Sequence, residues 1–250
     1  MTLGDESLRR LVIQGFRGVA KSWITAAFCA WVLLNHIEEN PQLNILVVSA
    51  SKQRADNFST FLLRLITEIP ELRHLAPREG QRSSKAGFDV GPSQATQTPS
   101  VVSLGITSAL TGNRADLIIA DDIEVPNNSA TTVMRDKLSE SIKEFDAILK
   151  PGGRIIFLGT PQTEDSIYAR LPERGYRTFV WPARYPNAKQ RESYGANLAK
   201  DIIEDLEANP ALEGKSTEPS RFSEEDLMER ELSYGRAGFA LQFMLDTSLS

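Results

Sequence analysis

The feature that most constrains the fold of this chain is the alternation of short apolar runs with longer amphipathic segments. The apolar runs have the length and aliphatic content of strands covered on both faces, and they fall at 11–14, 45–49, 117–120, 154–158 and 178–181. Apolar residues at helical spacing occupy 22–36, 52–69 and 131–149. Because strands separated by helices require crossover connections, the pattern predicts an α/β fold with a mainly parallel central sheet flanked by helices.

The segment before the third strand differs in composition from its surroundings. Residues 77–99 are rich in Gly, Pro, Ser, Gln and Thr, and two β-like pieces lie at 88–90 and 101–104. Such a composition is typical of turns and loops. We therefore expect an inserted loop or hairpin at the surface.

The pattern changes again after residue 181, where acidic amphipathic helices are clearest at 198–208 and 224–234. A stretch rich in Pro, Gly and Ser separates these two helices. We therefore expect two parts, a core at 1–181 and a small helical subdomain at 182–250.

Composition limits the classes of protein to which the chain can belong. With 28 basic and 33 acidic side chains the net charge is -5, so the surface as a whole does not attract nucleic acid and any such contact is local. The longest apolar stretch, at 23–34, is too short to span a bilayer, and no membrane partner is expected. The single cysteine, Cys29, lies on a helix-like apolar face, which predicts a buried thiol in an intracellular protein.

A phosphate-binding motif stands between the first strand and the first helix. It comprises Gly15, Phe16, Arg17, Gly18, Val19, Ala20, Lys21 and Ser22, and fits G-x-x-x-x-[G/A]-K-S. Such a loop directs backbone N–H groups at a polyphosphate, while Lys21 reaches the β and γ phosphates and the Ser22 hydroxyl binds Mg²⁺. Ala20 replaces the usual glycine, and because alanine resists positive φ, we expect a loop conformation that alanine can reach. The alternative is a helix start with a chance Lys-Ser pair.

An acidic pair follows the third strand, as in a Walker B segment. Asp121 is predicted to hold Mg²⁺, and Asp122 to orient or deprotonate the attacking water, with Glu124 as the rival for that role. The alternative is a strand that simply ends in solvent. A two-metal nuclease would need a further acidic cluster at a strand end, and the sequence offers none.

Three smaller features fit the same site. Arg17 lies inside the loop, where its guanidinium can neutralise charge on the transferred phosphoryl group. Thr160 and Gln162 follow the fourth strand, where side chains would project beside the γ-phosphate. Arg114, in a turn ahead of the acidic segment, could reach a neighbouring subunit's nucleotide. The alternatives are solvated arginines and an ordinary Gly-Thr-Pro turn.

Together these motifs resemble the ATPase part of large terminase subunits of tailed phages, most nearly those of T7-like phages. The resemblance covers nearly the whole chain and rests on residues 14–22, 48–52, 88–92, 110–116, 121–122, 158–163 and 238–245. It implies a P-loop ATPase of the additional-strand, conserved-glutamate type with a RecA-like core. Such a motor forms a ring on the capsid portal and drives double-stranded DNA into the procapsid by hydrolysing ATP.

The resemblance also implies a cofactor, partners and a location. These are Mg²⁺, the portal protein, the small terminase subunit and further copies of the chain in a pentameric ring, in the host cytoplasm and transiently on the procapsid portal. The stretch after Gly159-Thr160-Pro161 would be a helical lid, with Thr160 in the motif that couples hydrolysis to DNA movement. Many family members have Asp-Glu where Asp121-Asp122 stands, which leaves the catalytic carboxylate open between Asp122 and Glu124.

Two segments common in the family are not expected in this chain. Family members usually carry an adenine-contacting glutamine motif before the phosphate loop and an RNase H-like nuclease domain after the lid. Ten residues precede the first strand, and no nuclease-type acidic constellation follows the lid, so DNA cleavage is not expected.

Two other functions compete with a packaging ATPase. The first is a nucleotide-binding assembly module that hydrolyses nothing alone, and the second is a superfamily 2 helicase core. The helicase would need a second RecA-like domain, for which 182–250 is too short and too helical. DNA contacts would come from local cations such as Lys52, Arg54, Arg82 and Lys85, each of which is more often a solvated side chain.

Overall fold

The computed structural model describes residues 7–163 and 165–247, which divide into two compact units. Each unit is assembled from separate stretches of the chain. Unit 1 holds the described parts of Met1–Arg10, Ala20–Ile123 and Asp136–Phe157. Unit 2 holds the described parts of Leu11–Val19, Glu124–Arg135 and Leu158–Ser250.

The strands of unit 1 form a mixed, mainly parallel sheet. Their order in the sheet is β3 (Ser83–Ser84), β4 (Gly87–Phe88), β5 (Val101–Gly105), β2 (Ile45–Ser49), β6 (Ala115–Asp121) and β7 (Leu149–Gly159, whose last two residues belong to unit 2). β2 runs parallel to both β5 and β6, whereas β3 and β4 form an antiparallel hairpin. Every residue of β2 is buried, as expected for a strand covered on both faces.

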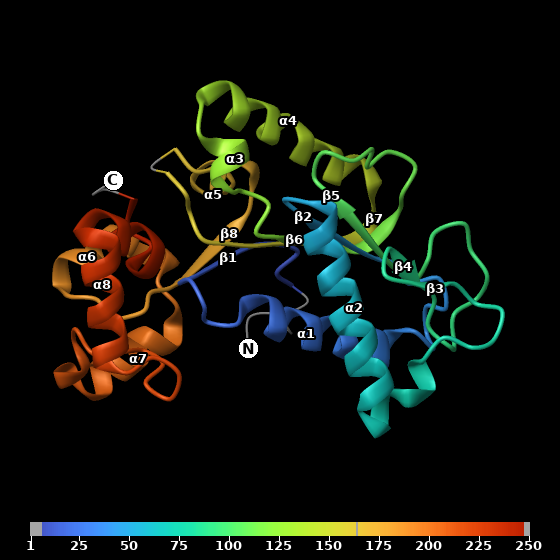
Figure 1. Ribbon diagram of the computed structural model, residues 1–250, viewed down its shortest axis with the longest axis horizontal. Coiled ribbons are helices and arrows are strands. Elements are labelled where there is room, and N and C mark those ends of the chain that lie inside the picture. The colour runs from blue at the N-terminus through green and yellow to red at the C-terminus, as the bar shows by residue number, and fades with distance from the viewer. Residues whose placement is uncertain (1–6, 164, 248–250) are drawn as a thin grey trace. The chain divides into compact units, whose positions relative to one another are not determined.

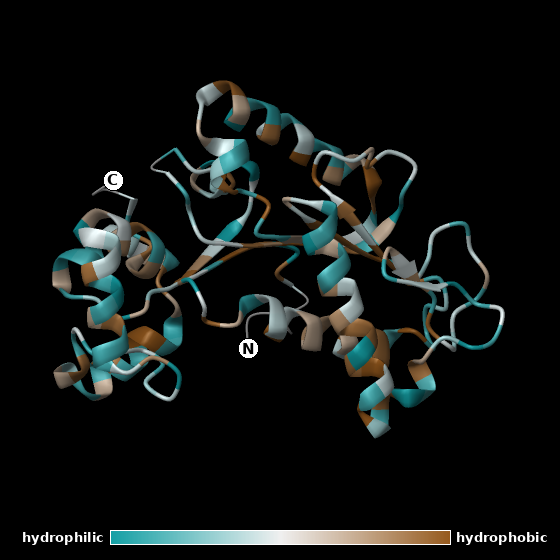
Figure 2. Ribbon diagram, in the orientation of Figure 1, coloured by the Kyte–Doolittle hydropathy of each residue, from teal (hydrophilic) through white to brown (hydrophobic). Residues whose placement is uncertain are grey.

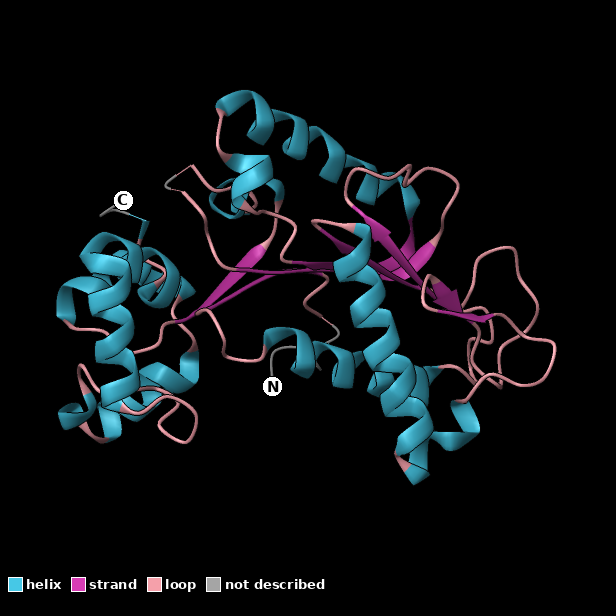
Figure 3. Ribbon diagram, in the orientation of Figure 1, coloured by secondary structure: helices cyan, strands magenta, loops and turns pink. Residues whose placement is uncertain are grey.

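Helices cover both faces of these strands. Helices α1 (Lys21–His36) and α2 (Lys52–Glu68) lie on one side and α4 (Thr132–Ile148) on the other (Figures 1 and 3). A short 3-10 turn at Pro70–Leu75 follows α2. On α4, Phe145 packs against Phe157 of β7 with ring centroids 5.7 Å apart. Figure 2 shows hydrophilic and hydrophobic turns alternating along α4, as an amphipathic helix on a sheet requires.

Unit 2 combines a pair of strands with short helices. Strand β1 (Arg10–Gly15) runs parallel to β8 (Arg177–Trp181). The helices are α3 (Pro126–Ser129), α5 (Ile167–Arg170), α6 (Ala188–Tyr194), α7 (Lys200–Ala208) and α8 (Glu224–Phe239), with a π-helical turn at Ala240–Met244. Short 3-10 turns lie at Pro172–Arg174, Gly195–Asn197 and Pro210–Leu212.

Two apolar clusters hold unit 2 together. One surrounds Ile202 and Leu206 of α7, and the other contains Phe16, Phe222, Phe239 and Phe243. The second cluster packs the residues after β1 against the last helices of the described chain. The segment at 11–19 is thereby fixed to a part of the sequence more than 200 residues away.

The predicted α/β fold with mainly parallel strands and flanking helices is confirmed. The expected strand at 45–49 has the predicted bounds, and the strand at 154–158 is the end of the longer β7. The helix expected at 131–149 ends at Ile148 and is preceded by the separate α3. Cys29 is fully buried, as predicted. Among the described residues no helix is long and apolar enough to cross a membrane.

The hairpin expected before the third strand is present as β3–β4, whereas the expectation that this segment lies at the surface is wrong for its apolar pieces. Val101–Gly105 is not at the surface, because it pairs in parallel with β2 and four of its five residues are buried. Phe88 and Val90 are also fully buried. The exposed strand β3 consists of two serines, whereas β4 and β5 carry the buried apolar residues Phe88, Val101 and Val102. The predicted lid at 182–250 lies within unit 2, and its boundary at 181 stays a prediction.

Candidate functional site

Two residues 99 positions apart meet within unit 1 at the carboxyl end of β6. Ser22, in the first turn of α1, donates its hydroxyl to Asp121, with Oγ 3.0 Å from each carboxylate oxygen. Asp121 is the last residue of β6 and is only 8% exposed. The phosphate loop's serine and the first acid of the Walker B segment, which sequence analysis assigned to one metal, are therefore in contact.

The surroundings of Asp121 determine how readily it carries a charge. Burial, followed by the negative charge of Asp122, raises the pKa of Asp121 to about 6. The hydrogen bond from Ser22 and the positive charges of Lys21 and Arg54 act in the opposite direction. A bound divalent cation would favour the ionised carboxylate further.

The donor set at this point fits Mg²⁺. Hydroxyl and carboxylate oxygens are hard ligands, and Mg²⁺ is commonly bound by one or two protein groups together with substrate phosphates. Ser22 and Asp121 are the residues that would hold such an ion through their side-chain oxygens. Within residues 7–163 and 165–247, no group of three or more His, Cys, Asp or Glu side chains is arranged to hold a metal alone.

Ala20 adopts a conformation that the sequence analysis did not expect. It is the N-cap of α1 and has φ 69° and ψ 29°, in the left-handed region. The sequence predicts a conformation that alanine can reach easily, whereas the loop keeps a left-handed residue here, at a strain for alanine of about 1 to 2 kcal/mol. Alanine has no side chain that could cap the helix, and the backbone N–H groups of Trp23 and Ile24 donate to the Ala20 carbonyl at 3.0 and 3.1 Å.

The first half of the loop belongs to unit 2 and is anchored by side chains. Phe16 is 1% exposed and meets the ring of Phe222 edge-on at 5.2 Å, while Val19 packs against the same apolar cluster. Gly18 has φ 90°, and a Cβ there would lie 3.0 Å from the Phe222 ring. The side chains of Phe16 and Val19 thus secure the loop, and their backbone N–H groups donate to the carbonyls of Trp181 at 3.2 Å and Phe16 at 3.4 Å. Their part in nucleotide binding stays a prediction.

Arg17 is oriented by a residue from the far end of the chain. Its Nε donates to Gln242 Oε1 at 2.9 Å, and its backbone N–H donates to the Gln242 carbonyl at 3.0 Å. Gln242 is 7% exposed and donates in turn to the carbonyl of Pro161 at 2.9 Å. Gln242 lies in the segment 238–245 that carries the family resemblance, but the sequence predicts no role for it, because a separation of 225 residues from Arg17 leaves no local signal.

Thr160 also contacts the loop within unit 2. It is buried, and its hydroxyl donates to the carbonyl of Gly15 at 3.0 Å. Gln162 donates its side-chain amide to the Thr160 carbonyl at 2.9 Å. The segment after β7 and the first residue of the phosphate loop are thus directly bonded.

The two candidates for the catalytic carboxylate differ in their environment. Glu124 is 1% exposed and accepts from the backbone N–H groups of Gln162 at 3.0 Å and Ile167 at 2.7 Å, and from the Ser166 hydroxyl at 3.0 Å. Burial is the main cause that raises the pKa of Glu124, and these hydrogen bonds oppose it. Both Glu124 oxygens are therefore occupied by the chain itself. Asp122, by contrast, is half-buried and has φ 45°, a strained conformation of the kind found at functional sites.

Arg114 lies at the amino end of β6, at the opposite end of this strand from the acid pair. Arg114 precedes β6, is exposed, and donates to the Asn113 carbonyl at 2.7 Å. The length of β6 puts it roughly 20 Å from Asp121. Its suggested action on a neighbouring subunit stays a prediction.

Arg54 acts on the acid pair, although the sequence suggests for it only a DNA contact. Its positive charge favours the ionised Asp121 carboxylate and so lowers the pKa of that group. The order of the strands explains how Arg54 reaches this place. α2 begins directly after β2, and Ser49 at the end of β2 pairs with Asp121 at the end of β6. The first turn of α2 consequently lies at the same sheet edge as the acidic pair.

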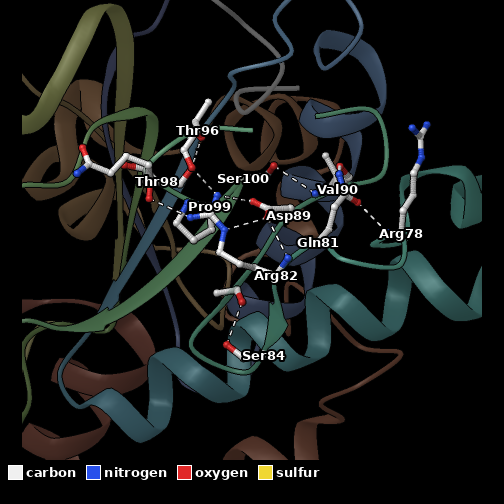
Figure 4. A network of polar contacts seen from close by, with 12 residues as sticks. Arg78, Gln81, Arg82, Ser84, Asp89, Val90, Thr96, Thr98, Pro99 and Ser100 are labelled. Atoms are coloured by element: carbon white, nitrogen blue, oxygen red, sulfur yellow. Dashed lines mark hydrogen bonds and ion pairs between the residues drawn. The ribbon is translucent and has the colours of Figure 1, made fainter. Parts of the chain in front are cut away.

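Two other cations suggested as DNA contacts are bound to neighbouring acids. Figure 4 shows Arg82 in a network with Asp89, where Nε–Oδ2 is 2.9 Å and Nη2–Oδ1 is 3.0 Å. Arg82 also donates to the carbonyls of Thr96 and Gln97. Lys52 pairs with Asp56 at 2.5 Å. The interactions of Arg82 favour a structural role over one in DNA binding.

Comparison with known proteins gives consistent results. No protein-family profile matches the chain. The terminase large subunit of Enterobacteria phage T3 is 50% identical over 99% of this chain, which spans only 42% of that relative. Among solved structures, the HK97 bacteriophage large terminase has a TM-score of 0.54 at 15% identity, over 94% of this chain and 46% of that one. The ATPase domain of the Thermus phage P74-26 large terminase also has a TM-score of 0.54, at 13% identity over 96% of this chain and 88% of that one. At these identities the two structures support a shared fold.

Proposed function

This chain is a relative of the phage large terminase subunits, and on that premise we propose that it hydrolyses ATP with Mg²⁺ to move double-stranded DNA into a procapsid. The single observation that carries the proposal is the contact of the Ser22 hydroxyl with both oxygens of Asp121 at 3.0 Å. A serine that follows a phosphate-loop lysine and meets a strand-end aspartate is the arrangement that binds a nucleotide-bound magnesium ion.

Each residue of the loop and the acid pair has a role in this proposal. Lys21 neutralises the β and γ phosphates, and Ser22 and Asp121 hold Mg²⁺. The ion supplies charge stabilisation of the phosphates when bound. Asp122 orients the attacking water, because Glu124 is fully engaged by Gln162, Ser166 and Ile167.

Arg17 and Thr160 support the same reaction. Gln242 sets the direction of the Arg17 guanidinium, which neutralises charge on the transferred phosphoryl group. Thr160 holds the loop through the Gly15 carbonyl, so it is suited to pass a change at the phosphates to the residues after β7. Arg114 is exposed and available to a neighbouring copy's nucleotide.

The assembly follows from the relatives' role in packaging. We propose a homo-oligomeric ring, a pentamer, that binds the portal protein, the small terminase subunit and double-stranded DNA in the host cytoplasm. The helices at 182–250 would act as the lid. The chain spans 42% of the length of the phage T3 relative.

A second candidate function is nucleotide binding without hydrolysis by the isolated chain. Two observations favour it. Ala20 holds a strained left-handed conformation in the phosphate loop, and the Glu124 carboxylate is bonded to the chain itself and so is not available to activate water. Binding of Mg²⁺-ATP with no phosphate release at concentrations below ring formation would support this candidate, and hydrolysis by the monomer would exclude it.

Phosphate release tests the main proposal. Lys21→Ala and Asp121→Ala should each lower turnover at least about 100-fold, because each removes about 3 kcal/mol of electrostatic stabilisation of the transition state. Lys143→Ala is the matched control, since Lys143 lies on α4 in an exposed pair with Glu140 and should leave turnover unchanged. Wild-type turnover in either site variant would contradict the proposal.

A further inference from the structure

Two aromatic side chains lie beside the metal-binding serine in unit 1. Trp23 directly follows Ser22 in the first turn of α1, and its side chain is 66% exposed. Its ring centroid is 4.4 Å from that of Phe61 on α2, with 50° between the ring planes. Phe61 is half-buried, so it supports the indole from behind while the indole remains open to solvent.

The position of Trp23 relative to the phosphates follows from helix geometry. Ser22 points toward Asp121, and the next residue of an α-helix projects about 100° further around the axis and about 1.5 Å further along it. Trp23 therefore points away from the acid pair and toward α2. In a phosphate loop the lysine and serine take the terminal phosphates and the metal, so the nucleoside end of the ligand lies away from the acid pair.

Trp23 exposes a large apolar surface next to the phosphate loop. Large apolar side chains near a ligand site commonly form part of it, because the ligand covers them. A nucleotide base offers a flat π face of the same size as the indole, and every base can stack regardless of its polar edge.

We propose that Trp23, supported by Phe61, is the platform on which the base of the bound nucleoside triphosphate stacks. This assignment rests on the proposed function, because it deepens the same site by naming what holds the nucleoside end. The platform has no polar group at the ring face, so it contributes affinity for the base and little discrimination between adenine and guanine.

Equilibrium binding to the full chain tests the platform. The ligands are a non-hydrolysable ATP analogue and inorganic tripolyphosphate, each with Mg²⁺. Trp23→Ala should weaken binding of the analogue about 10-fold, the effect of losing one base–aromatic stack, and leave binding of tripolyphosphate unchanged. Trp23→Phe should retain most of the affinity, because phenylalanine still offers a ring.

Trp31→Ala is the matched control. Trp31 is also exposed on α1, at 42%, but lies eight residues further on, roughly 12 Å along the helix. It should bind both ligands as the wild type does. Because Trp23 is exposed, its replacement should not disturb folding, which thermal unfolding of the same samples checks.

Fluorescence supplies an independent measurement. In a Trp31→Phe, Trp181→Phe background, Trp23 is the remaining tryptophan of the three in the chain. Its emission should change on adding the ATP analogue and not on adding tripolyphosphate.

The outcomes separate this inference from the proposed function. Unchanged analogue binding by Trp23→Ala, or an equal loss for both ligands, overturns the platform while leaving the phosphate site intact. Failure of the wild type to bind either ligand overturns the proposed function and the platform with it.

Discussion

At the residue scale, the most informative position is Ala20, where the chain holds a left-handed conformation without glycine. The residue stands between Gly18, which is also left-handed, and the helix that begins at Lys21. Two left-handed residues in this short loop turn the chain sharply into α1. Alanine therefore carries strain at a point where the loop geometry leaves it no alternative.

Replacing Ala20 by glycine should stabilise the protein. Relief of left-handed strain gains about 1 to 2 kcal/mol, and the greater freedom of glycine in the unfolded chain costs about 0.4 to 1 kcal/mol. The net gain should be about 0.5 kcal/mol, read from the midpoint of denaturant unfolding.

Ala27→Gly is the control for this substitution. Ala27 is exposed within α1 and has ordinary helical geometry, so glycine there should destabilise by about 1 kcal/mol. If Ala20→Gly lowers stability as Ala27→Gly does, the left-handed assignment of Ala20 is wrong.

At the scale of the elements, the short hairpin β3–β4 depends on the ion pair of Arg82 and Asp89. Arg82 binds both carboxylate oxygens of Asp89 and also two carbonyls of the connection before β5 (Figure 4). This network joins the hairpin to the polar connection that leads into β5. It explains how a segment with the composition of a surface loop delivers a buried strand to the sheet.

The stability that Asp89 contributes should depend on pH. Burial acts to raise the pKa of Asp89, but the hydrogen bonds and charge of Arg82 outweigh it and the pKa is lowered. A group whose pKa is lower in the folded state stabilises the fold above its unfolded pKa of about 4 and loses that contribution as pH falls through the folded pKa. Asp89→Asn should therefore cost about 2 kcal/mol at pH 7, and the difference from the wild type should shrink below pH 4.

Denaturant midpoints measured between pH 7 and pH 2.5 check this expectation. Glu68→Gln is the control, because the exposed pair of Glu68 with Arg64 should contribute less than about 0.5 kcal/mol at any pH. A cost of Asp89→Asn that is constant across this range would contradict the role of the ion pair.

At the scale of the whole molecule, segments remote in sequence meet at the phosphate loop. The side-chain amide of Gln242 accepts from Arg17 and donates to the carbonyl of Pro161. It thereby joins three stretches of unit 2 that are far apart in the sequence: the phosphate loop, the segment after β7 and the last helical turn. The side chain is buried, which gives these hydrogen bonds more weight than exposed ones would have.

Loss of the Gln242 amide should affect turnover more than nucleotide binding. Gln242→Ala leaves the Arg17 guanidinium without its orienting acceptor, so under the proposed function kcat should fall about 10-fold while Kd for Mg²⁺-ATP changes less than about threefold. Phosphate release and equilibrium binding give the two values.

Gln190→Ala is the matched control, because Gln190 caps the exposed start of α6 and should leave both values unchanged. An unchanged kcat in Gln242→Ala would show that catalysis does not require Gln242 to orient the Arg17 guanidinium.

What could be predicted from the sequence follows the range of the underlying interactions. The strand at 45–49 and the loop at 15–22 are each determined by consecutive residues, so the local sequence pattern is sufficient to predict them. The contact of Ser22 with Asp121 followed from a general rule, since loops after parallel strands meet at one sheet edge. Backbone conformation at Ala20 depends on the surrounding structure and leaves no trace in composition.

Other features depended on the order of strands rather than on local pattern. Burial of Val101–Gly105 requires its place beside β2, and the action of Arg54 on Asp121 requires β2 beside β6. Neither neighbour relation is encoded in a short window of sequence. The partnership of Arg17 and Gln242 is equally long in range.

The discontinuous make-up of the two units has a mechanical consequence. The backbone passes from one unit to the other at 19/20 and at 123/124, the first inside the phosphate loop and the second just after the acid pair. Because the backbone passes between the units at more than one point, cleavage of a single peptide bond at either crossing would leave the two units covalently joined.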